Sequence, residues 1–199
     1  MQYQYLTDSR SREIYKKNIG KIVKEAHKRK VKAVVIAGAS GSPVGTFFRH
    51  VWKILYPKER LPRFYGLELT DKILGIEYSQ DMRPPTTEEL EKIKRQLALN
   101  YPNLIRDIKE NKSVLLLDEY AVSGRTLKQR KNLLSKLGAK EIYATALVIH
   151  PSSKVDKEID ISVPRRIEDE PSWSGVYDRA TRKVVARDLK KLAEEISKK

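Results

Sequence analysis

The segment that decides the fold reads Val114-Leu115-Leu116-Leu117-Asp118-Glu119-Tyr120-Ala121-Val122-Ser123-Gly124-Arg125-Thr126. Four apolar residues followed by two acids predict a buried strand that carries two carboxylates to its end. A short turn with hydroxyl groups and a glycine comes next, and we expect a helix over about 125–137. The backbone amides and hydroxyls of such a turn, together with the N-terminus of the helix, suit a phosphate dianion.

The two acids have a different ligand chemistry from the turn. Asp118 and Glu119 repel a phosphate, but they suit neutral hydroxyl donors such as a ribose diol, or a hydrated Mg²⁺ ion. Acids on one side and a phosphate-binding turn on the other therefore predict a sugar phosphate as ligand. The alternative is an ordinary strand followed by a helix whose N-cap is Ser123, which explains neither the acid pair nor Gly124.

Apolar strands alternate with helices along the rest of the chain, and this order predicts an α/β fold with a doubly wound parallel sheet. With 199 residues, the chain is expected to form one domain. We expect helices over about 10–30, 43–55, 86–109 with an interruption near Tyr101-Pro102, 125–137 and 186–199. We expect strands at 31–37, 64–69, 73–78, 113–118 and 140–150, and irregular structure over 151–180.

The segment 114–126 resembles the motif with which type I phosphoribosyltransferases bind phosphoribosyl diphosphate (PRPP). That motif has four apolar residues, two acids, two variable positions, Ser/Thr-Gly, any residue and Ser/Thr, and every constrained position is filled here. The resemblance implies that Asp118 and Glu119 are catalytic, face the ribose 2- and 3-hydroxyls and help to hold Mg²⁺. It also implies that the 5-phosphate is wrapped by Ala121, Val122, Ser123, Gly124, Arg125 and Thr126.

A second loop follows the first expected strand. In the same family this loop binds diphosphate through backbone amides, which implies that role for Ala39, Ser40, Gly41 and Ser42. The loop also looks like the Gly-Ala-Ser turn of short-chain dehydrogenases, with Glu68 where a ribose-binding acid would follow. That alternative loses support because the chain has no Tyr-x-x-x-Lys, and the absence of Gly-Lys-Ser/Thr excludes a Walker A loop.

The resemblance further implies an activity and an organisation. The activity is Mg²⁺-dependent transfer of the 5-phosphoribosyl group from PRPP to a nucleobase-like acceptor, with release of diphosphate. Residues of about 12–150 would form the core, and 151–199 a small variable hood and a closing helix. Arg83, in a loop over 78–86, is a possible cation over PRPP, and Trp173 or Tyr177 could stack on a flat base. Members of the family are commonly homodimers.

Two positions depart from the family pattern. Ser40 stands where a Lys or Arg often precedes the glycine of the diphosphate loop, so one cation is missing. Val122 stands where 6-oxopurine transferases have an Asp near the purine, which disfavours hypoxanthine and guanine as acceptors. A second hypothesis therefore stays open, in which the protein binds PRPP or a nucleotide without turnover and acts as a regulator.

The composition limits the other classes of function. The chain has 41 Lys and Arg against 26 Asp and Glu, a net charge of +15, with basic residues concentrated at both ends. This excess fits solvated helix faces or contact with a polyanion, so nucleic acid is a possible but not a favoured partner. No apolar run is long enough for a membrane span and no secretory leader is visible, so we expect a cytoplasmic protein. The absence of cysteine excludes disulfides and thiolate metal sites.

Overall fold

The computed structural model describes residue 3 and residues 6–37, 42–66, 86–110, 112–121, 123–150, 159–163 and 179–196. Within these ranges six helices and four strands follow one another along the chain. They are α1 (Ser9–Lys28), β1 (Ala33–Ile36), α2 (Ser42–Leu55), β2 (Arg63–Gly66), α4 (Thr87–Asn100), α5 (Pro102–Lys109), β3 (Val114–Ala121), α6 (Arg125–Lys136), β4 (Ile142–Ile149) and α7 (Arg179–Ile196).

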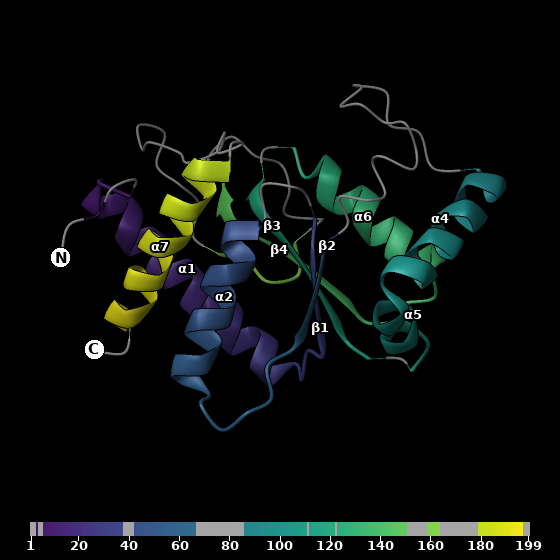
Figure 1. The fold of residues 1–199 in the computed structure, drawn as a ribbon, viewed down its shortest axis with the longest axis horizontal. Coiled ribbons are helices and arrows are strands. Elements are labelled where there is room, and N and C mark those ends of the chain that lie inside the picture. The colour runs from purple at the N-terminus through teal and green to yellow at the C-terminus, as the bar shows by residue number, and fades with distance from the viewer. Residues whose placement is uncertain are drawn as a thin grey trace.

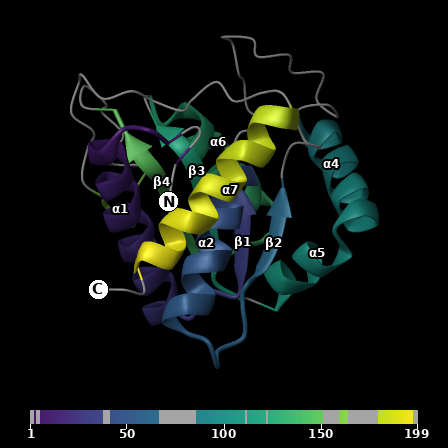
Figure 2. The same cartoon turned by 60° about the vertical axis from the view of Figure 1, so that its left-hand side comes forward.

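The strands form one sheet in the order β2-β1-β3-β4, and every neighbouring pair is parallel. Helices cover both faces of this sheet (Figures 1 and 2). One layer holds α1, α2 and α7, which contact one another, and the other holds α4, α5 and α6. The predicted α/β class, with a parallel sheet between two helical layers, is confirmed for the described residues.

The core lies on both faces of the central strands. The first four residues of β3 and all of β1 are buried, as expected for strands covered on both sides, which read as continuous apolar runs. The α1 helix faces the sheet with a stripe at helical spacing that includes Ile19, Ile22, Val23 and Ala26. In α2 the corresponding face contains Phe47, Phe48 and Val51.

Local signals explain several element boundaries. Thr86 and Glu89 form a capping box at the start of α4, each side chain accepting from the other residue's backbone amide. The predicted break at Tyr101-Pro102 separates α4 from α5. The predicted strand 64–69 is seen as β2 up to Gly66, and its remainder and the strand expected at 73–78 lie outside the described residues.

The last helix begins earlier than predicted. The sequence placed its start at residue 186, whereas α7 begins at Arg179. Its first turn contains Arg179, Thr181 and Arg182, so apolar periodicity gives no signal there. Val185 and Leu189 are buried, and α7 packs on α2 and α1. The chain near its start meets α7 as well, since the Leu6 amide donates to Asp188 Oδ2 at 3.1 Å.

Residues 159–163 lie along β4, on the side away from β3. The Asp160 amide donates to the Ala144 carbonyl at 2.8 Å, and Asp160 Oδ2 accepts from the Ala144 amide at 2.7 Å. Thr145 donates its hydroxyl to the Ile161 carbonyl. These bonds satisfy backbone groups that an open strand edge would expose.

Among the described residues, no helix combines the length and apolar character needed to span a membrane.

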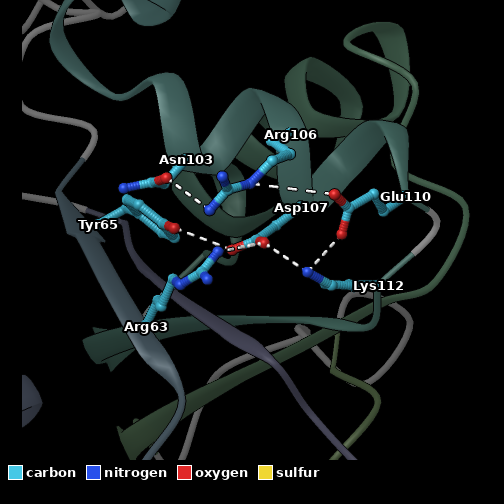
Figure 3. Close-up of polar contacts among 7 residues, drawn as sticks. All are labelled: Arg63, Tyr65, Asn103, Arg106, Asp107, Glu110 and Lys112. Atoms are coloured by element: carbon cyan, nitrogen blue, oxygen red, sulfur yellow. Dashed lines mark hydrogen bonds and ion pairs between the residues drawn. The ribbon is translucent and has the colours of Figure 1, made fainter.

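A buried carboxylate joins α5 to β2 at the amino-terminal end of the sheet (Figure 3). Asp107 accepts from Arg63 Nη1 at 2.6 Å, from the Tyr65 hydroxyl at 2.9 Å and from Lys112 Nζ at 3.0 Å. Its side chain is only 1% exposed. Burial raises the pKa of Asp107, but the hydrogen bonds from Lys112 and Tyr65 and the charge of Arg63 outweigh burial, so the pKa is lowered overall.

Asp107→Asn tests this anchor. A carboxylate whose pKa is lowered by folding stabilises the protein above its unfolded pKa, and this contribution is lost as the pH falls through the lowered value. We expect the variant to lose about 1–3 kcal/mol of unfolding free energy at pH 7, because Arg63 loses its counter-charge and Lys112 loses one of its two carboxylate partners. The loss should shrink at pH 3, where the parent protein is itself partly protonated. Urea unfolding at both pH values measures it, with Glu88→Gln at an exposed position of α4 as control. Equal losses at both pH values would contradict the assignment.

Candidate active site

The order of the strands creates a switch point between β1 and β3. These two strands are neighbours, but β1 leads into α2 on one face of the sheet and β3 leads into α6 on the other. In parallel sheets, ligands bind beyond the carboxyl ends of the strands at such a point. The two segments that the sequence selected, 39–42 and 121–126, lie at or just after the carboxyl ends of β1 and β3 in the chain.

At the carboxyl edge of the sheet, β3 extends further than β1. The last β1 residue, Ile36, is paired with Leu117, and the Ala37 amide donates to the Leu117 carbonyl at 3.0 Å. Beyond this level β3 continues to Ala121, paired within the described residues only with β4. The second half of β3 therefore stands beside the point where the 38–41 loop begins.

The turn after β3 has the form that the motif predicted. Gly124 has φ 68°, in the left-handed region that favours glycine, and it is the N-cap of α6. A glycine brings no capping side chain, and the first turn of α6 contains no acid. The Ser123 side chain is exposed and its oxygen accepts from the Arg125 amide at 3.3 Å, while Thr126 is half-buried. The N-terminus of α6, with its partial positive charge of about 0.5, thus opens at the switch point.

The two acids are placed differently from the prediction. The sequence predicted that the strand carries Asp118 and Glu119 at its end, but both lie inside β3 and are buried, at 8% and 4% exposure. The reason is that β3 continues along β4 beyond the level where β1 ends. Successive side chains of a strand point to opposite faces, so Asp118 faces the α6 layer and Glu119 the layer of α1, α2 and α7. The acids do not form one pair on one face.

Asp118 is held in an environment that disfavours its charge. Burial raises its pKa to about 6, against the smaller opposing effects of the Glu119 amide and the charge of Arg130. The Glu119 amide donates to Asp118 Oδ1 at 2.8 Å. Burial of a charge without a strong partner costs stability. Carboxylates with raised pKa values are therefore concentrated at functional sites, where binding or catalysis requires them despite this cost.

Arg130 is a site residue that the sequence analysis missed. It lies on α6, is buried, and donates from Nε to the Ala37 carbonyl at 3.3 Å. Its charge also acts on Asp118. One guanidinium therefore connects α6, the start of the 38–41 loop and the first acid of the motif. Residues 93 positions apart in the chain make this contact, so no local pattern could indicate it.

The remaining predicted site residues are partly outside the described ranges. This applies to Ala39, Ser40, Gly41, Arg83, Val122, Trp173 and Tyr177. Ser42 is the first residue of α2, so the N-terminus of α2 directly follows the predicted diphosphate loop. His150 follows β4 at the same edge of the sheet, where its ring meets Tyr120 edge-on and its amide donates to the Ala121 carbonyl.

The donor set fits Mg²⁺ only as an ion shared with a substrate. Among the described residues, no three His, Asp or Glu side chains gather as a metal site. Asp118 and Glu119 point to opposite faces, so one carboxylate at most reaches an ion in this arrangement. Mg²⁺ is commonly held by one or two carboxylates, several waters and substrate phosphates, which is compatible with a single protein ligand here.

Comparison with models of known protein families finds no match to this chain. A search of curated proteins also finds no significant relative.

Asp118→Asn tests whether this acid is kept at the expense of stability. Because folding raises its pKa, Asp118 lowers the unfolding free energy as the pH rises from about 4 to about 6, and the full penalty applies above that. We expect the amide to add up to about 3 kcal/mol at pH 7.5, from roughly two pKa units, and little at pH 4. Urea unfolding at both pH values measures the difference. Loss of stability at pH 7.5 would identify Asp118 as a structural residue.

Proposed function

We propose that this protein binds PRPP at the switch point between β1 and β3 and transfers its 5-phosphoribosyl group to a nucleobase-like acceptor, with release of diphosphate. The motif at 114–126 is the basis in sequence, and the position of its turn at the switch point is the basis in structure. The assignment to type I phosphoribosyltransferases and to a Mg²⁺-dependent reaction is part of this proposal.

One observation carries the proposal. Gly124 enters α6 in a left-handed conformation, so a hydroxyl at Ser123 and the amides of the first turn of α6 lie together at the carboxyl edge of the sheet. The N-cap glycine has no side chain, and the Ser123 hydroxyl accepts only weakly from the Arg125 amide at 3.3 Å, so this helix end is suited to an external anion. The α2 helix begins on the other side of the same switch point, directly after the predicted diphosphate loop. Two helix N-termini next to two loops fit a ligand with phosphate groups at both ends.

Different segments of the chain would bind the two phosphate-bearing ends of PRPP. The 123–126 turn holds the 5-phosphate and fixes the ribose, and the 38–41 loop with the start of α2 holds the diphosphate. A Mg²⁺ ion held by one carboxylate and the substrate's phosphates would supply positive charge that stabilises the departing diphosphate. In the reaction the bond from C1 to the diphosphate oxygen breaks and a bond from C1 to an acceptor nitrogen forms, so positioning and charge stabilisation supply most of the rate. Asp118 lies on the α6 side of the sheet, where its carboxylate would accept a hydrogen bond from a ribose hydroxyl of the bound PRPP.

A second candidate function is favoured by the placement of the acids. Asp118 and Glu119 are buried on opposite faces of β3, which fits a site that binds a phosphorylated ligand without turnover. Such a protein would bind PRPP or a nucleotide and signal its presence. Diphosphate release from PRPP with a panel of bases separates the two: release supports transfer, and saturable PRPP binding without release supports the regulator.

Ser123→Ala combined with Thr126→Val tests the proposed site. In the parent protein, PRPP with Mg²⁺ at about 100 times its dissociation constant should add about 2.7 kcal/mol to the unfolding free energy. Each hydroxyl removed takes away a charge-assisted hydrogen bond of roughly 1.5–3 kcal/mol, so the double variant should lose most of this gain. Ligand-dependent shifts in unfolding measure it.

The control is Ser135→Ala, which removes an exposed hydroxyl near the other end of α6 and should keep the full shift. An unchanged PRPP shift in the double variant would mean that the turn only begins a helix. No shift with PRPP, ribose 5-phosphate or any nucleoside monophosphate in the parent protein would remove the proposal.

A further inference from the structure

A pocket of about 190 Å³ lies on the other side of β1 from the switch point. It opens between the first turns of α2 and the last residues of β1 and β2. Its lining includes Ile36, Gly45, Thr46, Arg49, Phe64 and Gly66. Because Ile36 and Gly66 are the final residues of their strands, the pocket is at the carboxyl edge of the sheet, where α/β proteins bind ligands.

Arg49 is the charged group of this lining. Its guanidinium lies over the Phe64 ring, 4.2 Å from the ring centre. Within the described part of the chain, Arg49 forms no ion pair, unlike Arg63 on the neighbouring strand, which binds Asp107. Arg49 is exposed, so only one flat face of the guanidinium is covered by the ring, and the N–H groups around its edge remain suited to an oxyanion.

Two glycines give the pocket its space. A Cβ atom at Gly45 would come within 3.2 Å of Ile36 Cδ1, so a side chain there would push against the wall. A Cβ at Gly66 would meet no described heavy atom within 4 Å. Gly66 pairs with Ile36 in register, and strand alternation gives both the same face as Phe64, toward α2. A larger side chain at 66 would therefore grow into the pocket and leave the strand undisturbed.

The size and charge of the pocket define the class of ligand. Typical pockets for drug-sized ligands measure roughly 300–1,000 Å³, so this one suits a smaller molecule or one end of a larger one. An aromatic wall with one arginine and no described acid selects a group that carries negative charge. Guanidinium binds carboxylate and phosphate through two parallel hydrogen bonds. We propose that this pocket binds a small molecule through a phosphate or carboxylate group held by Arg49, at a site separate from the 123–126 turn.

A titration of the ¹⁵N-labelled full chain with inorganic phosphate at constant ionic strength tests the proposal. We expect saturable shifts of the amide signals of Gly45, Thr46 and Gly66. In Arg49→Met these signals should respond at least tenfold more weakly. Lys53→Met removes the same charge from an exposed position one turn further along α2, so it should respond like the parent protein.

Position 66 supplies a second, steric test. Gly66→Leu should abolish the response by filling the pocket, and Gly66→Ala should reduce it less, while unfolding curves verify that both variants are folded.

Titrations of the parent protein with diphosphate and with benzoate show whether phosphate or carboxylate is preferred, and a response to either supports the proposal.

The result that would overturn the proposal is no response at Gly45, Thr46 and Gly66 to any of the three anions. An equal response in Arg49→Met would overturn it as well. The signals of Gly124 and Thr126 report on the other site in the same spectra. Gly45 and Thr46 lie in the first turns of α2, whose start is also proposed to hold diphosphate, so Gly66 on β2 and the comparison with Arg49→Met distinguish the pocket from the PRPP site.

Discussion

The parallel pairing of β1 with β3 is the constraint on which the rest of the structure depends. It places side by side two strands that are followed in the chain by helices on opposite faces of the sheet, α2 after β1 and α6 after β3. Arg130 connects these elements, because its guanidinium donates to the Ala37 carbonyl while its charge acts on Asp118. The α6 helix is thereby coupled to the loop that begins after β1.

The two buried aspartates show how differently the fold treats a carboxylate. Asp107 has hydrogen bonds from Arg63, Tyr65 and Lys112, and its pKa is lowered, so its charge stabilises the folded chain. Asp118 is buried with weaker compensation, and its pKa is raised to about 6. The first arrangement is typical of an anchor between elements. The second costs stability at neutral pH, which is expected of a group retained for binding or catalysis.

Local sequence patterns were sufficient for most of the fold. The apolar runs at 33–36 and 114–117 predicted buried strands, Tyr101-Pro102 predicted a break between two helices, and Gly124 predicted the turn into α6. These signals depend on neighbours within a few residues. The extension of β3 past the acids did not follow from the sequence, because β4 supplies the pairing that continues it. Arg130 and the pocket at Arg49 were missed for a similar reason, since each depends on elements far apart in the chain.

The central claim is that the 123–126 turn binds the phosphate end of PRPP. An NMR titration of the ¹⁵N-labelled chain with PRPP and Mg²⁺ tests it most directly, because each amide of the turn reports separately. The account predicts saturable shifts that are largest at Gly124, Arg125 and Thr126 and that extend to Ala37 and the Arg130 side chain. Saturation with no change at these groups, or changes confined to other parts of the chain, would contradict it.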